Sequence, residues 1–274
     1  MPVTNPQNKF IKEGLAFDDV LLVPARSEIL PADADISTRL SRNITLRVPL
    51  MLMTADASEA IAIAQAGGMA LIEESEGQSD AIKQVKDTGL LCGAIISDTP
   101  DILEQVKVLI DAHVDMLVLD APHGHHTSAA DRVHTIKGEY PQAFLMAGGV
   151  VTQKGAEALI AAGADALKVG ICPLIIPETG VGMPSVTAIY NVSCIAASQS
   201  VSVLAHSPVK QSGDVVKALA AGANAVLLNP LLNGNENTMT EIAAQIAGGL
   251  RTTMSYCGCG NLKAFHKKSQ FITK

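Results

Sequence analysis

The densest group of potentially reactive side chains lies in one short segment near the middle of the chain. Asp120 ends an apolar run, and His123, His125 and His126 follow it closely. A carboxylate next to imidazoles is typical of acid/base catalysis or of a site that holds a ribose hydroxyl. Alternatively, Asp120 caps the helix that follows and the histidines are solvated. No third ligand stands at a suitable spacing from His123 and His125, so we predict no metal site.

A single cysteine, Cys172, follows a later apolar run, where a thiolate nucleophile would face the same site. The residues after it, 173–176, supply neither a base nor a series of free amide donors that would lower the pKa of the thiol. Cys172 is therefore either a displaced nucleophile or a buried, inert thiol. The five cysteines are odd in number and scattered, which favours reduced thiols over disulfides.

Two later segments, each directly after an apolar run, are candidates for binding a phosphorylated substrate. The first holds His206, Ser207 and Lys210, and the second begins with Asn229. A lysine close to the start of a helix, here expected at Ser212, attracts anions. Each segment also contains a proline, which removes one amide donor. We therefore predict weak phosphate binding at these positions.

Strand and helix patterns alternate along the chain and would position these side chains. Apolar strands are expected at 49–53, 69–72, 90–96, 116–119, 143–147, 166–169, 201–205 and 225–228. Helical periodicity is expected at 58–66, 79–87, 100–112, 128–139, 153–162, 184–200, 212–221 and 240–254. This α/β alternation predicts a closed (β/α)8 TIM barrel rather than an open doubly wound sheet. Because a barrel builds its site at the carboxyl ends of its strands, the candidates would meet at one face.

A short phrase recurs at the joints between helices and strands. It is found at 66–70, 112–116, 162–166 and 221–225, and three of the four copies contain Ala-Gly. A helix that ends at a glycine and is followed by a buried strand is typical of a parallel sheet.

No linker divides the chain, so we predict a single barrel domain over 1–274. Residues 1–45 form an extended N-terminal arm, punctuated by Pro24 and Pro31, that is expected to lie across the N-terminal face of the barrel. The barrel itself spans 46–256, and a basic tail at 257–274 packs outside it.

Composition excludes several classes of partner. Of the 274 residues, 20 are Lys or Arg and 27 are Asp or Glu, giving a net charge of −7 that offers no basic surface to nucleic acid. Trp is absent and there are five Phe and three Tyr, too few for base-stacking platforms. The apolar runs are too short to span a membrane, and the first residues lack a signal-peptide core. We therefore expect a cytoplasmic protein without membrane association.

Several motifs together resemble, in order, the IMP dehydrogenase and GMP reductase family. They are the segments 14–25, 120–125, 164–171, 180–184 and 212–223, followed by 248–251 and 257–260. The resemblance covers nearly the whole chain. It implies a (β/α)8 barrel, usually a homotetramer, in which a cysteine attacks the purine C2 of IMP and hydride passes to NAD, yielding XMP for GMP biosynthesis. By this resemblance Asp120 and His123 lie near the cofactor ribose, and Gly170 begins the cysteine loop.

The departures from the family pattern fall at the site. The loop after Gly170 is shorter than the glycine-rich cysteine loop of the family, and Cys172 comes too early in it. His206 begins a His-Ser-Pro run that replaces the family's Asp-Gly-Gly, and Asn229 with its following proline replaces a glycine turn. Gly149 stands where the family has asparagine.

Two larger family features are also missing. The segment 234–240 is too short for the mobile flap that supplies the water-activating base. The tandem regulatory insert is replaced by a direct run from Glu73 to Lys86.

Three functional interpretations follow. The first is an IMP dehydrogenase-like oxidoreductase that uses NAD on IMP, with its activity impaired or lost. The second is a non-catalytic barrel, either a pseudoenzyme or a scaffold stripped of its site. The third is an acid/base enzyme acting on a phosphorylated small molecule through Asp120, His123 and His206.

Overall fold

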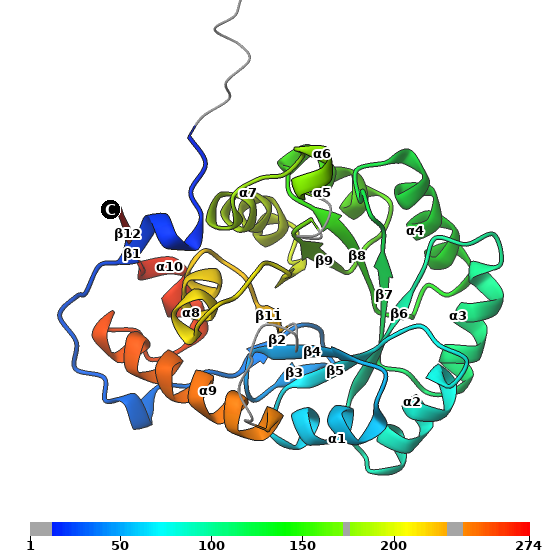
Figure 1. Cartoon of the computed structure of the whole chain (residues 1–274), viewed down its shortest axis with the longest axis horizontal. Coiled ribbons are helices and arrows are strands. Elements are labelled where there is room, and N and C mark those ends of the chain that lie inside the picture. The colour runs from blue at the N-terminus through cyan, green and yellow to red at the C-terminus, as the bar shows by residue number, and fades with distance from the viewer. Residues whose placement is uncertain (1–12, 172–175, 229–237) are drawn as a thin grey trace, which may run out of the picture.

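The computed structural model describes residues 13–171, 176–228 and 238–274, which form a closed barrel of eight parallel strands with helices outside it (Figure 1). The strands are β4 (Leu50–Thr54), β5 (Met69–Ile72), β6 (Cys92–Ile96), β7 (Met116–Asp120), β8 (Leu145–Val150), β9 (Ala166–Val169), β10 (Ser202–Ala205) and β11 (Ala225–Leu228). Neighbouring strands pair in chain order, and β11 closes the ring on β4. The predicted (β/α)8 barrel is therefore confirmed.

Helices alternate with these strands around the outside of the barrel (Figure 1). They are α1 (Ala57–Gln65), α2 (Gln78–Asp87), α3 (Ile102–Asp111), α4 (Thr127–Glu139), α5 (Gln153–Ala161), α6 (Ile176–Thr179), α7 (Ser185–Ser198), α8 (Ser212–Ala220), α9 (Met239–Tyr256) and α10 (Leu262–Lys268). All of the expected helices are present, while the short α6 and α10 were not predicted. Within the described ranges, no helix is both long and apolar enough to cross a membrane.

The recurring phrase is the joint that ends a helix and begins the next strand. At each copy one residue adopts a positive φ: Gly67 (+102°), His113 (+63°), Gly163 (+108°) and Gly222 (+113°). The amide of the next residue then donates to the carbonyl five positions earlier, at 3.0–3.2 Å. This bond pattern satisfies the last carbonyls of the helix and turns the chain into the barrel.

A polar residue in three of these joints fastens neighbouring strands together. Asp115, Asp165 and Asn224 each accept a hydrogen bond at 2.8–2.9 Å from a backbone amide at the start of the preceding barrel strand. The two aspartates also pair with Lys86 and Lys137, at 2.6 and 2.9 Å. These contacts hold the N-terminal ends of the strands in register.

A small hairpin closes the N-terminal end of the barrel. Its strands are β2 (Thr38–Arg39) and β3 (Thr45–Leu46). The buried side chains of Leu40, Ile44 and Leu46 pack with interior residues of β4, β5, β7 and β8, several of them methionine. Ser202 Oγ donates to the Leu40 carbonyl at 2.8 Å, which ties the hairpin to β10.

The two ends of the described chain meet outside the barrel. Strand β1 (Val20–Leu22) pairs antiparallel with β12 (Phe271–Thr273), next to α8 and α10 (Figure 1). Short 3-10 turns at Phe17–Asp19 and Pro31–Asp33 guide the N-terminal segment along this side. The C-terminal tail thus packs on the outer helices.

Candidate functional site at the barrel mouth

The carboxyl ends of β7 and β9 bring a carboxylate and an ammonium group together. Asp120 is the last residue of β7, and Lys168 lies within β9. Lys168 Nζ donates to Asp120 Oδ1 at 2.5 Å, although β8 runs between the two strands. A Cβ atom on Gly148 of β8 would come within 2.7 Å of Lys168 Cβ. The missing side chain of that glycine lets the lysine reach across β8.

The ion pair is largely withdrawn from solvent. The Lys168 side chain is 4% exposed and that of Asp120 is 29% exposed. A buried ammonium group needs a compensating charge, because removal from water penalises an isolated ion heavily. The carboxylate of Asp120 meets that need, so it serves first as the counter-ion of Lys168.

His206, directly after β10, completes a group that we name the mouth cluster: Asp120, Lys168 and His206. Burial, together with the charge of Lys168, lowers the pKa of the imidazole to about 4, and the charge of Asp120 opposes this shift only in part. The buried Nδ1 atom has no hydrogen-bond partner among the described residues. His206 is therefore a neutral side chain at physiological pH.

Glycines bring the strand ends around this cluster into direct backbone contact. A Cβ atom on Gly149 would lie 2.1 Å from the Gly170 carbonyl oxygen, and one on Gly170 would lie 1.8 Å from that of His206. Gly170 also has a φ of +136°, which side chains rarely adopt. A side chain at Gly149 or at Gly170 would therefore force the neighbouring backbone to move.

One of the three histidines in the loop after β7 has a local structural role. His126, not Asp120, caps α4: its Nδ1 accepts from the Ser128 amide at 3.2 Å. The alternative that Asp120 caps this helix is therefore wrong. His123 and His125 are exposed, with ring centroids 6.3 Å apart. In the described ranges no three His, Cys, Asp or Glu side chains are placed to hold a metal ion.

The residues that were predicted to bind an anion after β10 have other partners in the structure. Lys210 Nζ pairs with Asp18 Oδ2 at 2.9 Å, on the outside of the molecule, and both side chains are well exposed. The buried Asp214 carboxylate accepts the backbone amides of Lys210 and Gln211, at 3.0 and 3.3 Å. Ser207 is buried. A carboxylate thus already occupies the start of α8, where a phosphate was expected to bind.

Two predicted site residues, Cys172 and Asn229, lie outside the described residues, as does most of the segment proposed for the flap. The buried cysteines among the described residues show no activation. Burial raises the pKa of Cys92 to about 12 and also raises the pKa values of Cys257 and Cys259.

Sequence reasoning missed Lys168 as a member of the site. The signal was present, because a lysine in the middle of the apolar strand Ala166–Val169 must find a partner if it is buried. What the sequence did not show is the glycine of β8 that determines which carboxylate that lysine reaches.

Comparison with known proteins agrees with the fold and the motifs. The sequence model of the IMP dehydrogenase / GMP reductase domain matches residues 14–245. The inosine-5'-monophosphate dehydrogenase of Borreliella burgdorferi is 34% identical over 324 aligned residues, covering 96% of the chain and 80% of that relative. The enzyme of the same name from Bacillus subtilis is 26% identical over 459, covering 97% and 94%. That alignment is far longer than this 274-residue chain, so the relative carries residues that this chain lacks.

Proposed function

The chain belongs to the IMP dehydrogenase and GMP reductase family, and from this premise we propose that it is a purine-nucleotide barrel that has lost the family reaction. That reaction is the NAD-dependent oxidation of IMP to XMP. The ligand class we propose is IMP, bound weakly at the mouth, with NAD as the cofactor of the ancestral reaction. The protein would then act as a non-catalytic barrel.

The observation that carries this proposal is the end of β10. The family's Asp-Gly-Gly run offers a carboxylate for ribose hydroxyls and two flexible amide donors for phosphate. Here the run is His206, Ser207 and Pro208. A neutral imidazole lacks the paired acceptor oxygens of a carboxylate, and proline has no amide to donate.

The rest of the mouth supports the same proposal. Asp120 is paired through Oδ1 with the buried Lys168, so this carboxylate has a structural role that does not depend on a cofactor ribose. Gly170 begins the shortened cysteine loop at a point where its backbone contacts that of His206. Since catalytic groups act as a unit, loss of the nucleophile and of the phosphate-binding donors together removes most of the rate enhancement.

The acid/base alternative finds less support in the geometry. Two of its residues, Asp120 and His206, are both members of the mouth cluster. A histidine with a pKa of about 4 is a weak base, and the Asp120 carboxylate is engaged in an ion pair with Lys168. His123 is exposed in the loop.

Family membership also supports proposals about the form and place of the protein. We propose a homo-oligomer, a tetramer as in the family, located in the cytoplasm. We further propose that 46–256 form one barrel domain with an arm at 1–45 and a tail at 257–274.

Thiol reactivity tests the loss of the nucleophile. Mass spectrometry would follow alkylation of each cysteine by iodoacetamide, with and without saturating IMP. We expect Cys172 to react no faster than the exposed Cys194, with or without IMP. Cys172 labelling many times faster than Cys194, with protection by IMP, would overturn the proposal. The Cys172→Ala variant identifies the labelled peptide.

A further inference from the structure

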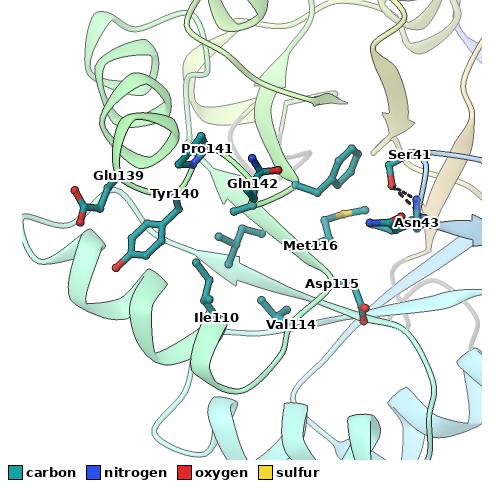
Figure 2. A pocket seen from close by; sticks show the side chains of 14 residues that line it. Ser41, Asn43, Ile110, Val114, Asp115, Met116, Glu139, Tyr140, Pro141 and Gln142 are labelled. Carbon is teal, nitrogen blue, oxygen red and sulfur yellow. Dashed lines mark hydrogen bonds between the residues drawn. The ribbon is translucent and has the colours of Figure 1, made fainter.

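A cavity of about 510 Å³, which we name the lower cavity, opens at the N-terminal end of the barrel (Figure 2). Three segments distant in sequence form it: the hairpin turn 41–44, the end of α3 with the start of β7 (110–117), and the end of α4 with the start of β8 (139–144). Pockets that hold small molecules have volumes of roughly 300–1,000 Å³. None of the residues assigned to the barrel mouth lines this cavity.

The larger part of the inner surface of the lower cavity is apolar. Ile110 and Val114 lie along one side, Met116 lies between them and the hairpin, and Tyr140 forms an edge (Figure 2). Phe144 also lines it, so two of the eight Phe and Tyr residues of the chain meet here. Aromatic and branched side chains of this kind bury the ring of a small molecule.

Two carboxamide side chains supply polar groups at the cavity. Asn43 belongs to the hairpin turn and Gln142 to the turn between α4 and β8 (Figure 2). Within the described ranges neither side-chain amide makes a hydrogen bond to the protein. Each carboxamide offers both a donor and an acceptor, so the matching ligand edge also carries both.

The charged residues in the lining of the lower cavity disfavour an anion. Of the described residues that line it, the charged ones are Asp115 and Glu139, and both are acidic. Asp115 is compensated by Lys86 at 2.6 Å, and the Glu139 carboxylate points away from the other lining side chains (Figure 2). The nearby Lys137 is held by Asp165 and by two backbone carbonyls. No free cation in the lining is therefore left to receive a carboxylate or phosphate.

We propose that the lower cavity binds a small, uncharged aromatic molecule that carries a carboxamide-type group. The ring packs on Ile110, Val114 and the Tyr140 side, and the amide edge pairs with Asn43 and Gln142. Such a site lies at the end of the barrel opposite the mouth cluster. This proposal does not depend on the proposed function, because its ligand is neither IMP nor NAD.

Methyl NMR with benzamide as the probe tests this assignment. With ¹³C-methyl isoleucine and methionine labels, we expect the Ile110 and Met116 signals to shift saturably, with a Kd in the millimolar range typical of so small a ligand. Benzoate, of the same shape but anionic, should bind at least about tenfold more weakly. The double variant Asn43→Ala/Gln142→Ala should weaken benzamide binding about fivefold or more.

A control variant for the benzamide experiment lies at the other end of the barrel. Gln153→Ala removes an exposed carboxamide at the start of α5, near the other end of the barrel, and should leave benzamide affinity unchanged. The proposal fails if the Ile110 and Met116 methyls do not shift while other methyls do. It also fails if benzoate binds as tightly as benzamide, or if the double variant, shown to be folded by its methyl spectrum, binds benzamide normally.

Discussion

The two ends of the barrel differ in the contacts that hold them together. At the N-terminal end, the hairpin side chains Leu40, Ile44 and Leu46 fill the opening with apolar contacts, and joint residues fasten strand to strand. At the carboxyl end, glycines bring backbones into contact around the mouth cluster, which is polar. The first end specifies the fold, and the second is where the family carries out its chemistry.

The contrast shows how a barrel can keep its architecture while its site changes. The joints and the hairpin lie at the end of the barrel opposite the mouth cluster, so changes at the mouth leave them in place. At the mouth, the position of Lys168 depends on a glycine of β8, and the position of His206 depends on Gly170.

Gly170→Ala should destabilise the protein most, by about 4 kcal/mol, because the new Cβ would lie 1.8 Å from the His206 carbonyl oxygen at a φ of +136°. Urea denaturation measures the loss. Gly213→Ala is the control, since a Cβ there meets nothing within 4 Å, and its effect should stay within about 0.5 kcal/mol. A loss below about 1 kcal/mol for Gly170→Ala would show that the mouth backbone is not tightly packed.

Leu46→Ala should cost about 3 kcal/mol, because this buried side chain belongs to the apolar cluster under the barrel. Leu30→Ala is the control, because it removes the same side-chain atoms from a residue that is 65% exposed. The difference between the two unfolding free energies then measures the effect of burial. Equal unfolding free energies for the two variants would contradict a structural role for the hairpin.

Stability should fall by about 2 to 3 kcal/mol as pH decreases from 6.5 to about 4, owing to His206. The unfolded imidazole takes up a proton in this range, whereas burial and Lys168 keep the folded one neutral, so protons favour unfolding. His206→Asn should flatten the curve relative to the exposed-site control His134→Asn. Part of the slope remains, because burial also lowers the pKa of His266. Identical pH curves for the two variants would remove His206 from the account.

Lys210→Ala should have the smallest effect, with no measurable change in the urea midpoint, because its ion pair with Asp18 is solvent-exposed on both sides. Because Lys210 pairs with Asp18 on the outside of the molecule, we also expect this variant to bind IMP with unchanged affinity. Calorimetry would measure that affinity. A marked loss of IMP binding would restore the predicted phosphate site after β10.

The fold was predictable because its signals are local. The joint phrases specify a helix end, a positive φ and a buried strand within a few residues, and even His113 takes the position that glycine fills elsewhere. The site was less predictable because its contacts are not local. Asp120 was expected to cap a helix or to bind a ligand, and its actual partner, Lys168, is 48 residues away along the chain.

The same limit applies to the loop after β10. The sequence shows a lysine and a helix start, which together predict an anion site. It does not show that the Asp214 side chain turns back onto the amides of Lys210 and Gln211, or that Asp18 approaches from the other end of the chain.

The central claim, that the barrel is kept and the reaction lost, is tested most directly by incubating the purified protein with saturating IMP and NAD and following NADH absorbance. We expect no NADH above the rate of the Cys172→Ala variant. NADH production that this substitution abolishes would show that the reaction proceeds on a displaced thiol, and it would contradict the account.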